Sequence, residues 1–196
     1  EIRNCDWSSD VCSSDLYGTL NVNGIFYMRT SNTSGNYIVD IKDGGKIYVD
    51  SISSNASGTG GCNLIIESNG WLNIYGSSAF YNFSTTNNTY TCNTGSLVEY
   101  SGSTAQPVES GISYANLKYS GSNSKTQDGN LTVSGDLTVD AAIYDAGTGV
   151  VSLALGGNFT MQNSGTMAST NCKYNLTINC INNNTQTFNG GGNSFY

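Results

Sequence analysis

The chain repeats one phrase: GTLNV at residues 18–22, GKIYV at 45–49, GWLNI at 70–74 and GSLVE at 95–99. Each copy opens with glycine and is expected to place its third and fifth residues on one face of a strand. The glycines Gly18, Gly45, Gly70 and Gly95 are 27, 25 and 25 residues apart. A regular interval of this size is typical of stacked copies of one structural unit.

Apolar and polar residues alternate in the phrase and in its relatives further along the chain. Leu131 and Val133 flank Thr132, and the same pattern recurs at 137–139, 159–161 and 176–178. Alternation with a period of two, with threonine among the polar positions, predicts half-buried strands. Asn-Gly and Asp-Gly pairs between the strands supply tight turns. No apolar stripe of helical length accompanies them, so the fold class is all-β.

Recurrence of a whole phrase favours a parallel β-solenoid (β-helix) over residues 17–196, with coils of about 25 residues. Inward leucine, isoleucine and valine would form ladders along its axis, and asparagine and threonine would coat the outside. The alternative is an antiparallel β-sandwich, which also has short strands at regular spacing.

The first sixteen residues are unlike the rest. Residues 6–16, DWSSDVCSSDL, resemble the translation of a common sequencing-library adapter. We therefore expect residues 1–16 to be an artefact outside the fold and disordered. On this interpretation residues 17–196 are a solenoid fragment truncated at both ends.

The composition limits the function. The chain has 7 Lys and Arg against 14 Asp and Glu, a formal net charge of −7, and no His. This charge argues against nucleic acid as a partner, because phosphate binding needs clustered cations. No apolar run is long enough for a membrane span. Without His or a Cys-x-x-Cys pair, no metal site or cofactor is expected. Cys62, Cys92, Cys172 and Cys180 could form disulfides or remain free thiols.

Catalytic carboxylates are the test of an enzymatic interpretation. Carbohydrate-cleaving β-helices need carboxylates that converge on one face. The candidates are Asp40, Asp43 and Asp50, interleaved with Lys42 and Lys46. We interpret them as a charged, solubilising corner, and Asp136, Asp140 and Asp145 as turn or strand-end residues. No catalytic residue is predicted.

Aromatic residues are concentrated between residues 71 and 90. Exposed rings on a polar face can stack on sugars, so Trp71, Tyr75 and Tyr81 are predicted as a glycan-binding set. Phe80, Phe83 and Tyr90 belong to the same cluster. The alternative is that these rings pack a loop against the core.

The C-terminal half carries longer runs: YANLKYSG at 114–121, GNLTVSGDLTV at 129–139 and GGNFT at 156–160. A stretch at 103–119 is echoed at 185–196. Over about residues 95–196 the chain resembles large, repetitive secreted surface proteins of Bacteroidetes-type bacteria. The resemblance implies export, often by a C-terminal sorting domain, and a stalk or passenger role at the cell surface.

The predicted function is a non-catalytic structural or adhesive segment of a secreted bacterial cell-surface protein. Its expected partners are a glycan or another cell-surface component and neighbouring repeats of the same polypeptide. The alternative function is a fragment of a carbohydrate-active β-helix, either a polysaccharide lyase or a hydrolase.

Overall fold

The structure, a computed structural model, describes residues 11–30, 36–56, 61–77, 80–81 and 88–192. It is the predicted parallel β-solenoid and not the alternative antiparallel sandwich. Every strand pair in the described residues is parallel, and each strand pairs with the corresponding strand of the next coil. The coils therefore stack through backbone hydrogen bonds along the axis of the rod.

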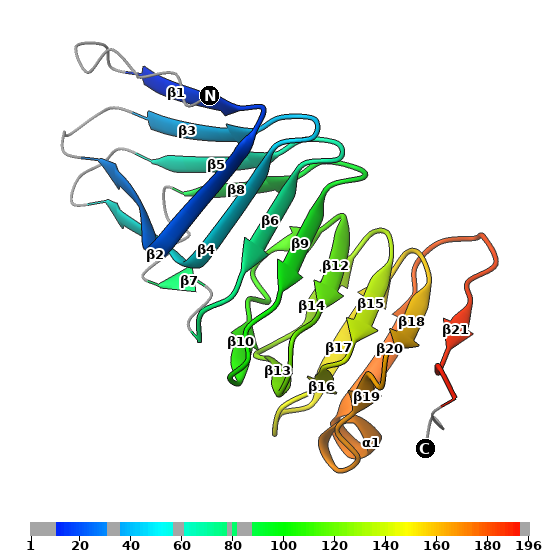
Figure 1. Ribbon diagram of the computed structural model, residues 1–196. Coiled ribbons are helices and arrows are strands. Elements are labelled where there is room, and N and C mark those ends of the chain that lie inside the picture. The colour runs from blue at the N-terminus through cyan, green and yellow to red at the C-terminus, as the bar shows by residue number, and fades with distance from the viewer. Residues whose placement is uncertain (1–10, 31–35, 57–60, 78–79, 82–87, 193–196) are drawn as a thin grey trace.

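One sheet, called here the long sheet, runs through the whole solenoid (Figure 1). Its strands are β2 (Thr19–Thr30), β4 (Lys46–Ala56), β6 (Trp71–Ile74), β9 (Leu97–Tyr100), β12 (Asn116–Tyr119), β15 (Leu137–Asp140), β18 (Phe159–Gln162) and β21 (Phe188–Asn189). The short strand β7 (Phe80–Tyr81) pairs with the second half of β4.

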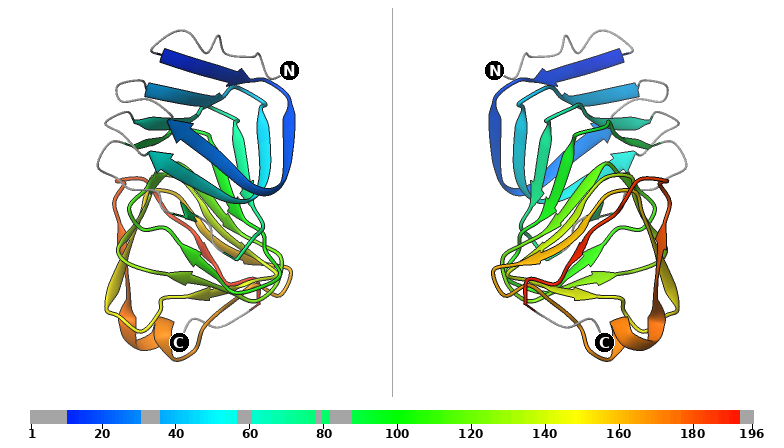
Figure 2. Two further views of the ribbon diagram at one scale, coloured as in Figure 1. Left: turned by 90° about the vertical axis from the view of Figure 1, so that its left-hand side faces the viewer. Right: turned by 90° about the vertical axis from the view of Figure 1, so that its right-hand side faces the viewer.

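Three shorter sheets complete the other faces. The N-terminal sheet contains β1 (Val11–Leu16), β3 (Asn36–Ile41), β5 (Cys62–Ile66) and β8 (Thr89–Cys92). C-terminal sheet I contains β10 (Gln106–Val108), β13 (Ser124–Gln127), β16 (Ile143–Asp145) and β19 (Thr166–Met167). C-terminal sheet II contains β11 (Ser113–Tyr114), β14 (Leu131–Val133), β17 (Val151–Leu155) and β20 (Leu176–Cys180). The C-terminal coils have a three-sided outline in Figure 2.

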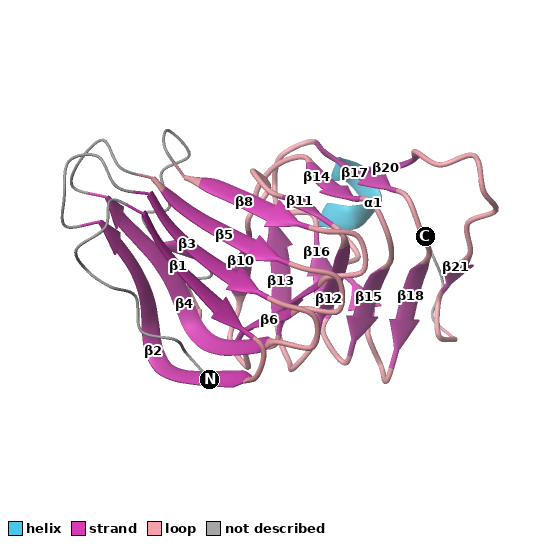
Figure 3. Ribbon diagram, turned by 90° about the horizontal axis from the view of Figure 1, so that it is seen from above, coloured by secondary structure: helices cyan, strands magenta, loops and turns pink. Residues whose placement is uncertain are grey.

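A short helix, α1 (Asn171–Asn175), interrupts this pattern between β19 and β20 (Figure 3). The sequence did not predict it, because one turn of helix is too short to produce a periodic apolar stripe.

Coil length divides the solenoid into two parts. In the long sheet Thr19 pairs with Lys46, Lys46 with Trp71 and Trp71 with Leu97, so the coils between them have 27, 25 and 26 residues. We call these the long coils. Leu97 pairs with Asn116, and the next two coils, from Leu117 to Leu137 and from Leu137 to Phe159, have 20 and 22 residues. These are the short coils. The last coil, from Phe159 to Phe188, has 29 residues and contains α1.

The core is a set of inward ladders, as the alternation predicted. From β4 to β18 the inward positions of the long sheet are buried, and they are occupied by Ile47 and Val49, Leu72 and Ile74, Val98 and Tyr100, Leu117 and Tyr119, Leu137 and Val139, and Phe159 and Met161. In β21, at the end of the stack, Phe188 is 40% exposed. Burial of such side chains supplies most of the stabilisation of the stack.

The glycine of the phrase is required by close backbone approach. A Cβ on Gly45 would lie 2.1 Å from the carbonyl oxygen of Leu16, and one on Gly70 would lie 2.8 Å from that of Ile41. The residue before it takes a positive φ, 75° at Gly44 and 59° at Asn69. Asn-Gly and Gly-Gly at this corner follow from these two constraints.

The fourth copy of the phrase is out of register with the others, which corrects the prediction for residues 95–99. Trp71 pairs with Leu97, so Val98 and Tyr100 point inward, and Leu97 and Glu99 lie on the outer face. One extra residue precedes this strand, and a shift of one residue exchanges the two faces. The shift keeps the Glu99 carboxylate out of the apolar core.

The expected disorder of residues 1–16 is wrong for Val11–Leu16. These residues form β1, which pairs in parallel with all of β3, and Leu16 is buried in the core. Backbone pairing at a sheet edge needs only an extended segment, and Leu16 occupies the inward position of Ile41 in the next coil. Residues 1–10 lie outside the described residues.

The Asn or Asp that precedes the strand in phrases such as Gly-Asn-Leu-Thr-Val has a structural role at the corners of the coils. The Asp136 N–H donates to Asn116 Oδ1 (3.0 Å), and the Asn158 N–H donates to Asp136 Oδ1 (2.7 Å). The Thr187 N–H then donates to Asn158 Oδ1 (3.0 Å). Each side chain thus satisfies a corner N–H of the following coil, which would otherwise have no strand partner.

Candidate functional site

Two of the predicted sugar-stacking residues lie on the outer face of one strand. Trp71 and Tyr75 flank the β6 segment so that both side chains lie on the face opposite Leu72 and Ile74, and both are half-buried. Trp71 packs edge-on against Tyr48 of β4, with ring centroids 5.3 Å apart, and Lys46 Nζ is 5.0 Å from the Trp71 ring centroid. We call Tyr48, Trp71 and Tyr75 the aromatic face.

Tyr75 is held by its hydroxyl. Tyr75 Oη donates to the carbonyl oxygen of Val22, two coils away, over 2.7 Å. Val22 lies at the register shift between β2 and β4, where the regular ladder is interrupted. Because the hydroxyl is tied to the backbone, the ring has a fixed position and needs little ordering when a ligand binds.

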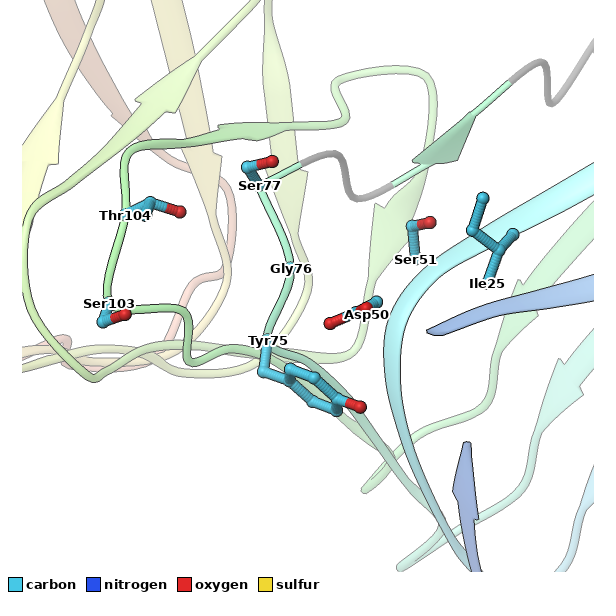
Figure 4. A pocket seen from close by; sticks show the side chains of 8 residues that line it. All are labelled: Ile25, Asp50, Ser51, Tyr75, Gly76, Ser77, Ser103 and Thr104. Carbon is cyan, nitrogen blue, oxygen red and sulfur yellow. The ribbon is translucent and has the colours of Figure 1, made fainter. Parts of the chain in front are cut away.

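A groove of about 530 Å³ lies beside Tyr75. This volume is within the range of small-ligand sites. Figure 4 shows Tyr75, Gly76 and Asp50 near its centre, Ser77, Ser103 and Thr104 on one side, and Ile25 and Ser51 on the other. We call this the seam groove, because it lies where the long coils meet the short coils.

The seam groove exists because one face of the solenoid is interrupted. β7 pairs with β4, and C-terminal sheet I begins at β10, so no ladder joins β7 to β10. Gln106 of β10 crosses this gap: its Nε2 donates to the carbonyl oxygens of Ile74 (3.2 Å) and Gly76. Gln106 is 1% exposed, and these bonds fix the backbone that forms the floor of the groove.

The three candidate catalytic carboxylates do not converge. Asp40 is on the outer face of β3 and pairs with Lys42, and this hydrogen bond raises the pKa of the lysine. Asp43 is at the following corner and accepts a hydrogen bond from Asn69 Nδ2 (3.0 Å). Asp50 alone lines the seam groove. Among the described residues no three His, Cys, Asp or Glu side chains gather closely enough to hold a metal ion.

The other three aspartates have structural roles, as predicted. Asp136 belongs to the corner ladder described above. Asp140 forms an ion pair with Lys118 (2.9 Å) and accepts from Asn163 Nδ2 (2.8 Å), and these two partners lower its pKa. Asp145 accepts the Gly147 N–H (2.8 Å) and a hydrogen bond from Asn171 Nδ2 (2.7 Å).

The remaining aromatic residues follow the alternative interpretation where they can be described. Phe80 and Tyr90 pack edge-to-face at 5.0 Å and contact the core. The backbone of Tyr81 pairs with Ser53, whereas its side chain lies outside the described residues, as does Phe83. The structure therefore places Trp71 and Tyr75 on one outer row, with Asn73 between them, and does not test Tyr81.

Cys62, Cys92, Cys172 and Cys180, for which the sequence left disulfides open, are free thiols in this structure. Cys62 and Cys172 are buried, and each Sγ donates to a backbone carbonyl oxygen, that of Met28 and that of Tyr144. Burial raises the pKa of both thiols and raises that of Cys92 to about 11. Their protonated state makes them poor nucleophiles at neutral pH.

Sequence reasoning missed Tyr48 and most of the groove. Tyr48 could have been found, because it is the outward residue of GKIYV and the register places it beside Trp71. The residues Ile25, Ser77, Ser103 and Thr104 carry no comparable signal, since the coil geometry alone brings them together.

No protein-family model, curated protein or solved structure matches this chain. In the described part of the chain, no helix is long and apolar enough to cross a membrane.

Proposed function

We propose that this chain is a non-catalytic, carbohydrate-binding segment of an exported bacterial repeat protein, and that it binds glycans through the aromatic face. One observation carries the proposal: Trp71 of β6 and Tyr75 directly after it lie on the same outer row, half-buried, and the Tyr75 ring is fixed by its hydroxyl bond to Val22. Flat rings on a rigid polar sheet suit the C–H faces of sugars.

The surroundings of these rings support the same chemistry. Asn73 between them is buried, and its amide is bonded within the fold, through Nδ2 to Glu99 Oε2 (3.2 Å) and through Oδ1 to Ser101 Oγ (2.6 Å), so it keeps this face rigid. Lys46 covers part of the Trp71 ring and supplies a hydrogen-bond donor at the edge of the face. A sugar combines apolar C–H surface with hydroxyl groups, so stacking rings next to polar groups recognise both parts.

The cellular setting rests on sequence resemblance. The repeated Asn-Leu-Thr-Val phrases at 129–139 resemble those of secreted surface proteins, and a solenoid is a suitable spacer because each coil adds length without a separate core. The adhesive role and the stalk role are compatible in one segment.

Affinity electrophoresis in gels that contain soluble polysaccharides tests the proposal. We expect the wild-type chain to be retarded and Trp71→Ala to lose at least tenfold in affinity, because stacking contacts on a rigid face contribute strongly. Tyr17→Ala removes an exposed ring outside the aromatic face and is the matched control. If Trp71→Ala and Tyr17→Ala migrate like the wild type, the aromatic face is not the binding surface.

The enzymatic alternative has one supporting observation, the carboxylate of Asp50 in the seam groove. Glycoside hydrolysis ordinarily uses two carboxylates across the bond, and Asp50 is the single acid among the residues that line this groove. Release of reducing sugar by the wild type, abolished in Asp50→Asn, would favour the enzyme over the adhesin.

A further inference from the structure

The seam groove and the aromatic face share Tyr75. The ring belongs to the outer row of β6, and it also lines the groove, as Figure 4 shows. A chain of sugars stacked on Trp71 and Tyr75 would therefore reach the groove at its end. This inference rests on the proposed function and identifies the part of the site that selects the ligand.

The lining of the groove has the chemistry of a sugar subsite. Ser51, Ser77, Ser103 and Thr104 provide hydroxyl groups that can donate and accept, and Asp50 provides an acceptor. Ile25 and the Tyr75 ring provide apolar surface. Both are needed for a pyranose, which has hydroxyls around its rim and C–H groups on its faces.

A peptide strand fits this place poorly. The unpaired edge at the seam is β10, the terminal strand of C-terminal sheet I. Its central residue is Pro107, the single proline of the chain, which has no N–H to donate. Proline on an edge strand prevents the addition of a further strand. The groove is thus closed to recognition by strand addition.

The charge of the groove excludes acidic sugars. Among the described residues that line it, Asp50 is the one carboxylate and none is Lys or Arg, and the chain has a net charge of −7. A uronic acid or sulfated sugar would bring a second negative charge to Asp50 without a compensating cation.

We propose that the seam groove is the subsite for one uncharged hexose unit of the bound glycan, with Asp50 accepting hydrogen bonds from its hydroxyls and Tyr75 stacking on its face. The aromatic face then supplies general affinity, and the groove supplies the preference for uncharged over acidic chains.

The test is affinity electrophoresis of the full chain against neutral glucan, neutral galactomannan and polygalacturonate. We expect retention on a neutral polysaccharide, a loss of about fivefold in Asp50→Asn, and a larger loss in Asp50→Ala, because a hydrogen bond to a charged group is about twice as strong as a neutral one. Ser77→Phe fills the groove from an exposed position and should lose at least tenfold. Asp43→Asn removes the charge of an acid outside the groove and should bind like the wild type.

Other outcomes overturn the inference in distinguishable ways. If Trp71→Ala loses binding while Asp50→Ala and Ser77→Phe retain it, the groove is not a subsite and the proposed function stands. If the gel that contains polygalacturonate retards the protein more strongly than the gels that contain neutral polysaccharides, the assigned ligand class is wrong. If the wild type is retained by none of the three, the groove assignment and the proposed function both fall.

Discussion

The long coils and the short coils build one solenoid with different cores. The long coils are filled by aliphatic side chains such as Ile47, Leu64 and Leu72, each 1% exposed or less. The short coils enclose a column of tyrosines instead. The ring centroids of Tyr100 and Tyr119 are 6.3 Å apart, and those of Tyr119 and Tyr144 are 5.5 Å apart. A ring has more volume than an aliphatic side chain, so fewer inward residues are needed to fill the cross-section of a short coil.

The short coils also bury polar groups, and nearly all of these are hydrogen-bonded. Tyr114 Oη donates to the carbonyl oxygen of Glu109 (2.7 Å) and contacts Tyr100 Oη at 2.8 Å. Lys125 is fully buried, and its Nζ donates to the carbonyl oxygens of Gly102 (2.6 Å) and Ser122 (3.0 Å). Buried directional bonds thus help to fix the register of the short coils from inside the core. In the long coils the core is aliphatic, and bonds between coils such as those from Asn69 to Asp43 and from Tyr75 to Val22 lie toward the outside.

Removal of core volume should have the largest effect and should remain local. Phe159→Ala in the short coils is expected to cost about 3–5 kcal/mol, and Leu72→Ala in the long coils about 2–5 kcal/mol. Because each coil contacts only its neighbours, amide hydrogen exchange should show lost protection mainly in the half that carries the substitution. Equal loss in both halves would show that the two core types form one cooperative unit.

The buried lysine should give the short coils a distinctive pH response. Burial lowers the pKa of Lys125 to about 8, below its ordinary value in the unfolded chain. The unfolded state then binds more protons between pH 8 and 10, so this group makes the protein more stable as the pH rises through that interval. The pKa is lowered from 10.5 to about 8, and a displacement of that size corresponds to about 3 kcal/mol at most.

The comparison of the wild type with Lys125→Met isolates this effect. Burial also raises the pKa of Tyr114, Tyr119 and other core tyrosines, so both proteins lose stability as the unfolded-state tyrosines ionise near pH 10. In urea unfolding at pH 8, 9 and 10, the free energy of unfolding of the wild type should rise relative to that of the variant. A constant difference would mean that Lys125 is not desolvated as the structure has it.

Two buried tyrosines of the short coils, Tyr114 and Tyr119, should respond in opposite directions to loss of the hydroxyl. Tyr114→Phe removes a satisfied hydrogen bond and should cost about 1 kcal/mol. Tyr119 Oη is buried and has no partner among the described residues, so Tyr119→Phe should be neutral or stabilise by up to about 1 kcal/mol. Thermal unfolding of the two variants side by side measures the difference, and equal losses would contradict it.

The smallest effect is expected for an ion-pair bridge on the outer face of the short coils. Lys118 bridges Glu99 (3.3 Å) and Asp140 (2.9 Å). Lys118→Gln should cost under about 1 kcal/mol because the pair is partly exposed. The cost should shrink in 1 M salt, and also as acid protonates Asp140, whose pKa is lowered in the folded state. A loss that does not depend on salt would indicate packing rather than charge.

The fold could be predicted because its cause is periodic. Leu20, Ile47 and Leu72 recur at the coil interval, and alternation along each strand assigns their inward face. The register failed at GSLVE because Leu97 and Val98 are both apolar, so alternation alone does not decide which one points inward. The position of Glu99 decides it, through partners in other coils that the sequence does not reveal.

The candidate site was predictable only in part, for a similar reason. Trp71 and Tyr75 share a face because they are four residues apart in one extended segment, a spacing that can be read from the sequence. Asp50 was identified as a carboxylate but grouped with Asp40 and Asp43, which the turn at Gly44 and Gly45 separates from it. Ser103 and Thr104 reach the groove only because β7 and β10 do not pair.

The interruption at the seam also has a mechanical consequence. Two of the three faces are broken there, between β7 and β10 and between β8 and β11, and the long sheet alone crosses both breaks. A rod is stiff in bending when its hydrogen-bonded walls are continuous on all sides, and it yields where one wall alone carries the load. We therefore expect the rod to bend most readily at the seam, where the core and the long sheet continue but the other two ladders stop, and a glycan bound there would resist or follow each bend.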